Sequence, residues 1–185
     1  MTYQEIIDQI KPELEKVISF LEKELGRIRT SRASPSLVED IEVECFNQKF
    51  PLKQLGSILI AGPRQLTIQP WDKSYLEPIE KAISQTSLGA APVVDKDLIR
   101  ISFPQLSEEY RKDLLNLLST KKEETKRTIR RWREQAWDKI QKGFKEGEIR
   151  EDDKFRGKDK LQELIDQYNE KIDEITERKK KEISE

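Results

Sequence analysis

A run of basic side chains in the second half of the sequence has the residue types and the spacing of a phosphate-binding surface. Between residues 121 and 142, nine lysines and arginines stand against four acidic residues. At about 100° per residue on a helix, four of them fall within one quadrant: Lys122, Lys126, Arg130 and Arg133. Trp137 falls in the same quadrant, so its ring could stack on a base while the cations hold phosphates, a combination used in RNA contacts. The composition leaves open a second interpretation, a solvated helix face with Trp137 lying against a neighbouring arginine.

The composition speaks against catalysis by this chain. It has no histidine, so the usual general base and the commonest metal ligand are missing. The single cysteine, Cys45, can form neither an intramolecular disulfide nor a thiolate metal cage, and we expect it to fill the core. No glycine-rich phosphate loop occurs, and the many carboxylates lie on charge-rich segments that are typical of solvated faces. We therefore expect no enzyme activity, no cofactor and no metal site.

The overall composition indicates a cytoplasmic protein built from helices that are each buried along one stripe. Of the 185 residues, 38% are charged and 35% are hydrophobic, which is too polar for one large core. The formal net charge is -1, so an anionic partner must be met by a local patch. No apolar run approaches the length of a membrane span, and no signal peptide is present. We expect a monomer.

The first of three predicted helices occupies residues 1–29. Its apolar residues recur at sevens, which indicates the seam of a bundle or coiled coil: Ile7, Leu14, Leu21 and Ile28. Thr2 and Glu5 have the spacing of a capping box. Pro12 interrupts the pattern, so the regular helix either begins there or kinks.

Two further helices are predicted after residue 105. Ser107 is a good N-cap, with acidic residues in the turn that follows. The stripe of the second helix has residues at threes and fours, or at seven in one place, and all are apolar except Thr125: Leu114, Leu118, Thr125, Ile129, Trp132, Ala136 and Ile140. We place the next turn at Gly143, Gly147 and residues 148–153, and a third stripe runs from Leu161 to Ile183. Three such stripes bury one another in a three-helix bundle.

The segment between the first two helices is predicted to be a separate, mostly β domain. Seven of the eight prolines fall in it, and proline breaks helix interiors. Alternation predicts strands at 41–45, 57–60, 65–69 and 98–103, and helical spacing predicts a helix at 75–86. The strands are separated by turns at Asn47-Gln48 and residues 61–64. The fold class is therefore α+β, with a bundle at 1–30 and 106–185 and an inserted domain at 31–105. Two segments cross between them, and we expect a hinge there: Thr30, Ser31, Phe103, Pro104 and Gln105.

Several short motifs, in this order and spacing, make the whole chain resemble the ribosome recycling factor family. They are Ile28-Arg29-Thr30, Arg32-Ala33-Ser34-Pro35, Pro51-Leu52, Gln54-Leu55, Pro70-Trp71-Asp72-Lys73-Ser74, Ile79-Glu80-Lys81-Ala82-Ile83, Leu88-Gly89, Arg111-Lys112-Asp113-Leu114, Arg130, Arg133 and Asp152-Asp153. The resemblance implies an elongated three-helix bundle with a β-rich domain inserted after the first helix, arranged as an L.

The same resemblance implies a function and a set of partners. A member of this family binds the large ribosomal subunit after termination and, with elongation factor G and GTP, splits the ribosome and frees messenger and transfer RNA. The bundle's arginines contact ribosomal RNA, and the matching positions here are Arg29, Arg111, Arg130 and Arg133. Lys122 and Lys126 join them on helical geometry alone. Because the GTPase supplies the energy, the chain needs no cofactor of its own.

Two alternatives from other classes stay open. One is an RNA-binding or ribosome-associated helical adaptor, related to the recycling factor but with altered partner use. Glu134, which replaces the second arginine of the family's Arg-Arg pair, would weaken RNA attraction locally. The other is a structural coiled-coil protein that self-associates. A β domain inserted through two crossings speaks against such a rod.

Overall fold

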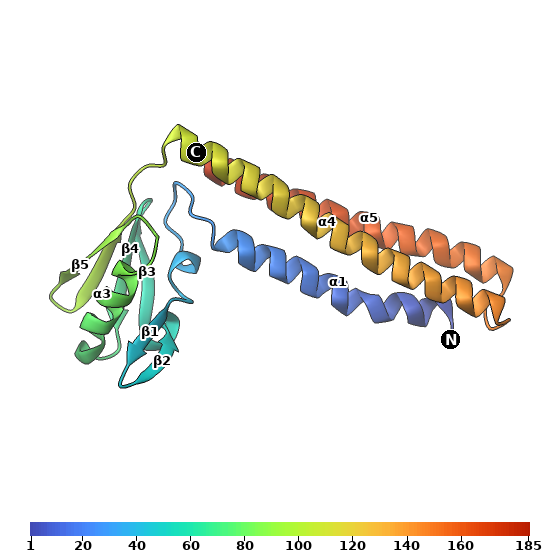
Figure 1. Cartoon of the computed structure of the whole chain (residues 1–185), viewed down its shortest axis with the longest axis horizontal. Coiled ribbons are helices and arrows are strands. Elements are labelled where there is room, and N and C mark those ends of the chain that lie inside the picture. Colours follow the sequence, from blue (N-terminus) through green and yellow to red (C-terminus); the bar gives the residue numbers. More distant parts are fainter. The chain divides into compact units, whose positions relative to one another are not determined.

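The computed structural model describes residues 1–185, which form two compact units (Figure 1). One unit comprises residues 1–25 and 115–180, and the other comprises residues 26–114 and 181–185. None of the helices is long and apolar enough to cross a membrane.

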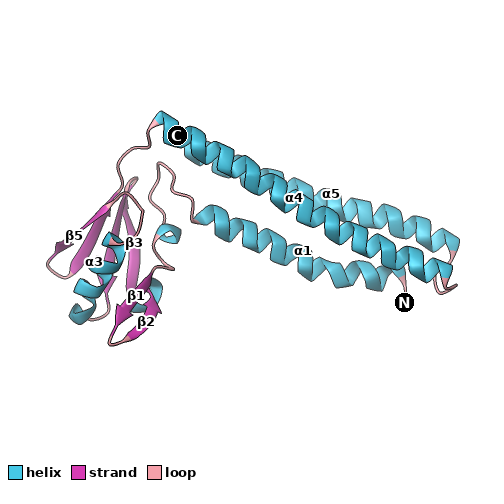
Figure 2. Ribbon diagram, in the orientation of Figure 1, coloured by secondary structure: helices cyan, strands magenta, loops and turns pink.

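The first unit is built from most of three helices that run side by side (Figure 2), whereas residues 108–114 and 181–184 of these helices group with the other unit. They are α1 (Tyr3–Gly26), α4 (Glu108–Lys145) and α5 (Glu151–Ser184). Each helix contributes one apolar stripe to a shared core, as the spacing of the apolar residues predicts. The buried residues of this unit include Ile6, Ile10, Leu14, Ile18, Leu21, Leu118, Ile129, Ala136, Ile140, Leu161, Ile165, Tyr168 and Ile172. The Tyr168 hydroxyl also donates to Glu15 Oε1 at 2.5 Å and so ties α5 to α1.

The predicted helix starts are confirmed at the level of individual hydrogen bonds. Thr2 Oγ1 accepts from the Glu5 amide at 3.3 Å, and Glu5 Oε2 accepts from the Thr2 amide at 3.0 Å. This reciprocal capping box fixes the start of α1 at Tyr3, and the helix continues through Pro12 rather than beginning there. Ser107 Oγ accepts from the Tyr110 amide at 3.2 Å, which caps α4 as predicted.

The predicted turn between the second and third helices was too long at both ends. Gly143 lies inside α4, and residues 151–153 form the first turn of α5. Three carboxylates in that first turn, Glu151, Asp152 and Asp153, face the positive end of the helix dipole and favour helix over turn.

The second unit contains all the strands. They are β1 (Glu42–Cys45), β2 (Gln48–Pro51), β3 (Gly56–Gly62), β4 (Gln65–Pro70), β5 (Ala91–Asp95) and β6 (Leu98–Ser102). β1 and β2 form a hairpin, and the other four form an antiparallel sheet in the order β3-β4-β6-β5. The short helical segments are η1 (Pro35–Leu37), α2 (Leu52–Leu55), η2 (Lys73–Tyr75) and α3 (Leu76–Ser84).

This unit has a hydrophobic core of its own, drawn entirely from residues 33 to 103. Alternate residues of the central strands, Leu66 and Ile68 on β4 and Ile99 and Ile101 on β6, are fully buried. Ile79 and Ile83 of α3 complete this core. Cys45 belongs to the same core, as expected, and burial raises the pKa of its thiol.

Three local predictions in this unit need correction. The first turn is Phe46-Asn47 rather than Asn47-Gln48, and both residues have positive φ, 52° and 62°; such turns match the twist of a two-residue hairpin. β5 was missed because it contains Pro92, which is tolerated here at the edge of the sheet. The predicted helix at 75–86 is shorter, 76–84, and Asp72 caps the preceding turn by accepting from the Ser74 amide at 2.8 Å.

Candidate nucleic-acid interface

Four predicted phosphate-binding residues lie on one side of α4, within a single compact unit: Lys122, Lys126, Arg130 and Arg133. We call this set the basic ridge. From the first to the last of them the helix rises about 16 Å, at 1.5 Å per residue. The two arginines are exposed and the two lysines are half-buried. Trp137, half-buried, continues the ridge.

The lysines of the ridge are paired with an acidic residue of α5. Lys122 Nζ and Lys126 Nζ each lie 2.8 Å from Oδ1 of Asp173. The two ammonium groups, Lys122 first, hold the pKa of Asp173 below its usual range. Two positive charges facing one negative charge leave a net charge of +1 at this site. Its attraction for an anion is therefore weaker than the two lysines of α4 alone suggest.

The arginines of the ridge are freer to meet a ligand. Arg130 is exposed and makes no ion pair or hydrogen bond with the rest of the chain. Arg133 Nη1 donates only to the neutral Gln162 Oε1, at 3.2 Å. A guanidinium can bind a phosphate through two parallel N–H groups. The arginine half of the ridge is therefore the stronger candidate for phosphate contact.

Replacing Asp173 with asparagine should strengthen RNA binding by this surface. Asp173→Asn removes the charge that neutralises Lys122 and Lys126, and it keeps the shape of the side chain. We expect tighter binding to large-subunit RNA and a log–log salt dependence that steepens by up to roughly 0.7–0.9 for each lysine freed to contact a phosphate. Filter binding across a salt series measures both quantities. Glu174→Gln removes one carboxylate from an exposed position of α5 that makes no ion pair or hydrogen bond, and it is the matched control. An unchanged slope in Asp173→Asn would remove the lysines from the interface.

The other two predicted RNA contacts, Arg29 and Arg111, group with the second compact unit. Arg111 precedes Arg130 by 19 residues, about 28 Å along α4, and its buried Nε has no hydrogen-bond partner. Arg29 is engaged inside its own unit: Nη2 donates to the Pro104 carbonyl at 2.6 Å and Nη1 to the Leu88 carbonyl at 3.2 Å. The structure thus gathers four of the six predicted residues into one surface.

The predicted hinge residues differ widely in burial. Thr30 and Phe103 are 5% and 4% exposed, whereas Pro104 and Gln105 are exposed. Both crossing segments are hydrogen-bonded to the hairpin turn of β3 and β4, because the Ala33 amide donates to the Pro63 carbonyl at 2.7 Å and the Phe103 amide to the Arg64 carbonyl at 2.8 Å. The two crossing segments, residues 27–34 and 103–107, are short and have no regular secondary structure.

The comparisons with known proteins agree with this architecture. A family model described as ribosome recycling factor matches residues 21–183. The chain belongs to the ribosome recycling factor family. It is 41% identical to the ribosome-recycling factor of Natranaerobius thermophilus over 179 residues, which is 97% of each chain. It is also 40% identical to that of Bacillus subtilis over 182 residues, 98% of each chain.

Two solved structures of recycling factors share the fold. A solution structure of the ribosome recycling factor matches with a TM-score of 0.79 and 37% identity, covering 98% of this chain and 97% of the other. The second match has a TM-score of 0.71 and 36% identity, and each chain is 99% covered. It is the T. thermophilus ribosome recycling factor, from models of that factor and E. coli elongation factor G bound to the E. coli post-termination complex.

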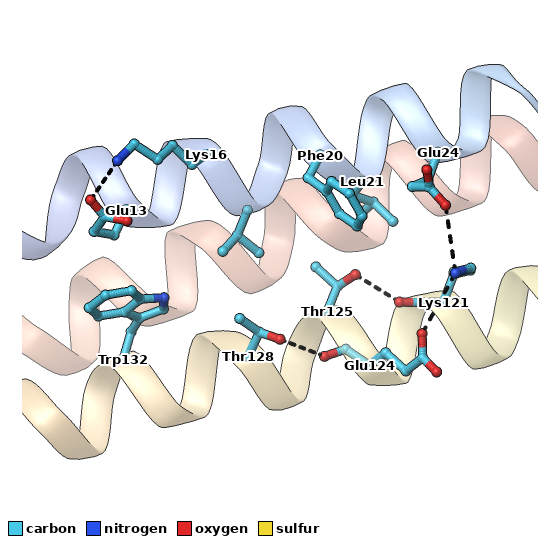
Figure 3. Close-up of a pocket in the computed structure, with 11 residues that line it drawn as sticks. Glu13, Lys16, Phe20, Leu21, Glu24, Lys121, Glu124, Thr125, Thr128 and Trp132 are labelled. Carbon is cyan, nitrogen blue, oxygen red and sulfur yellow. Dashed lines mark hydrogen bonds and ion pairs between the residues drawn. The ribbon is translucent and has the colours of Figure 1, made fainter.

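A groove that the sequence did not predict lies along α4, on the flank opposite the basic ridge. Figure 3 shows it between α1 and α4, with Phe20 and Leu21 on one wall and Thr125, Thr128 and Trp132 on the other. Its volume is about 450 Å³. Phe20 is 64% exposed, and Trp132, which the stripe placed in the core, is only half-buried. The small side chains of the two threonines were the signal that α1 and α4 do not close tightly here.

Proposed function

We propose that this chain binds the ribosome after termination and, with elongation factor G and GTP, splits it so that messenger and transfer RNA are released. The observation that carries the proposal is the likeness to recycling factors at about 40% identity over nearly the full length of both chains. The likeness to the factor placed on a post-termination complex with elongation factor G supports the same partners.

We assign the two parts of the chain to different steps. The bundle, residues 1–30 and 106–185, would hold the large subunit through the basic ridge, and the inserted domain, residues 31–105, would meet the GTPase. The separate core of residues 33 to 103 supports an inserted domain of its own, and the compact unit around it extends further, over residues 26–114. The chain would act in the cytoplasm, where it would meet the ribosome. It would catalyse no reaction of its own, because it lacks histidine and a phosphate loop and because the GTPase supplies the energy.

A sedimentation experiment tests this function directly. Ribosomes stalled after termination are incubated with the chain, elongation factor G and GTP, and the ratio of free subunits to whole ribosomes is measured. We expect splitting only when all three are present, since the chain would hold the large subunit and the GTPase would supply the energy from GTP. Omitting GTP or the chain is the control. Ribosome binding without splitting would favour the adaptor, and no binding would contradict both functions.

A further inference from the structure

The guanidinium of Arg133, at the exposed end of the basic ridge, is held by a side chain of the neighbouring helix. Its Nη1 donates to Oε1 of Gln162 at 3.2 Å. Gln162 lies on α5, 29 residues away in the sequence. Both residues belong to the compact unit of residues 1–25 and 115–180. The hydrogen bond therefore joins two helices that run side by side within one unit (Figure 2).

A second hydrogen bond sets which end of the Gln162 amide faces Arg133. The Gln162 Nε2 donates to Oδ1 of Asp166, four residues further along α5, at 2.8 Å. Glutamine and aspartate at this spacing on a helix form a favourable pair. An ionised carboxylate only accepts hydrogen bonds, so Asp166 takes the NH₂ group of the amide and leaves the amide oxygen for the guanidinium. With the amide reversed, its NH₂ group would face a cation that also can only donate.

Gln162 holds its cation without neutralising it, unlike the carboxylate that faces the lysines of the ridge. Asp173 pairs with Lys122 and Lys126 and offsets one of their two charges. Arg133 makes no ion pair, and its one hydrogen bond goes to a neutral amide. Its Nε–H and Nη2–H edge is left for a ligand, and two parallel N–H groups of this kind suit a phosphate. The α5 side of the ridge thus keeps the full charge of Arg133 while restricting its movement.

We propose that Gln162, oriented by Asp166, is a positioning residue for the contact with the large subunit: it holds the Arg133 guanidinium in place before the RNA phosphate arrives. Ordering a long side chain at an interface costs binding free energy, and a side chain that is already ordered avoids part of that cost. The proposal rests on the large-subunit binding proposed above. It extends the interface to a residue of α5 that acts through Arg133.

Replacing Gln162 with methionine tests the positioning. Methionine is nearly the same length and has no amide, so Gln162→Met removes both hydrogen bonds and keeps the apolar stem. We expect the Kd for the large subunit to rise roughly two- to tenfold, the range for one side chain that must be ordered on binding. The log–log salt dependence should keep its wild-type slope, because Arg133 still reaches a phosphate. Filter binding across a salt series measures both quantities.

Two further variants separate the position of Arg133 from its charge. Gln167→Met is the matched control, because it replaces another exposed glutamine of α5 that lies beside α1 instead of α4. It should bind like the wild type. Gln162→Glu keeps an acceptor for Arg133 but adds a carboxylate that would offset its charge. We expect this variant to bind more weakly and, unlike Gln162→Met, to show a flatter salt dependence.

A double-mutant cycle shows whether Gln162 acts through Arg133. In a chain that already carries Arg133→Ala, Gln162→Met should not change the Kd further, because the side chain that it positions is gone. An equal loss with and without Arg133 would overturn the proposal, and so would wild-type affinity in Gln162→Met alone. If the wild-type chain itself did not bind the large subunit, the proposed function would fail and the positioning with it, whereas the variants by themselves test only the positioning.

Discussion

Replacing residues 31–105 with a short flexible loop should abolish ribosome splitting while leaving a folded bundle that still binds the large subunit. The bundle should fold because its buried residues come from α1, α4 and α5, and none of the inserted domain's core residues contributes to it. Binding should persist because the whole basic ridge lies on α4. Splitting should be lost entirely, since elongation factor G would have no inserted domain to act on.

Three measurements check this prediction on one preparation. Circular dichroism reports helix content, pelleting with large subunits reports binding, and sedimentation of post-termination ribosomes with elongation factor G and GTP reports splitting. The isolated 31–105 domain added in trans is the control and should not restore activity, because it would no longer be joined to the bundle that binds the ribosome. The division of labour would be wrong if the shortened chain split ribosomes at the full rate. It would be equally wrong if binding disappeared while the helices stayed native.

Features that depend on neighbouring residues were predicted well from the sequence. The capping box of Thr2 and Glu5 and the N-cap at Ser107 were right because each is a hydrogen bond across three residues. The alternation of Val43 and Cys45 with glutamates gave β1 because one face of the hairpin is buried and the other is not.

Features that depend on distant residues were not predictable in the same way. β5 contains a proline that is acceptable only at a sheet edge, and its edge position follows from the strand order rather than from its own residues. The basic ridge was predicted from α4 alone, so its pairing with Asp173, 47 residues or more away, was missed. Arg29 likewise looked like an available cation until Leu88 and Pro104 were placed beside it.

Removing both arginines of the basic ridge should weaken binding to the large subunit more than any other pair of substitutions on α4. Each charge-assisted contact is worth about 1.5–3 kcal/mol, so Arg130→Ala plus Arg133→Ala should raise the Kd roughly 100-fold or more. Two lost phosphate contacts should also flatten the log–log salt dependence by roughly 1.4–1.8. Helicity should not change, because both side chains are exposed and lie off the buried stripe.

A second pair of substitutions tells a specific contact from a general loss of charge. Arg131→Ala plus Lys139→Ala removes the same charge from exposed positions on other faces of the same helix, so a long-range field would respond equally to both double variants. We expect this control to bind within a few-fold of the wild type with nearly its salt slope, because it takes no cation from the ridge. Equal losses in the two double variants would mean that α4 attracts RNA only through its net charge. No loss in either would make the ridge a solvated helix face, and the contact with the large subunit would then have to be sought on Arg111 or elsewhere on the bundle.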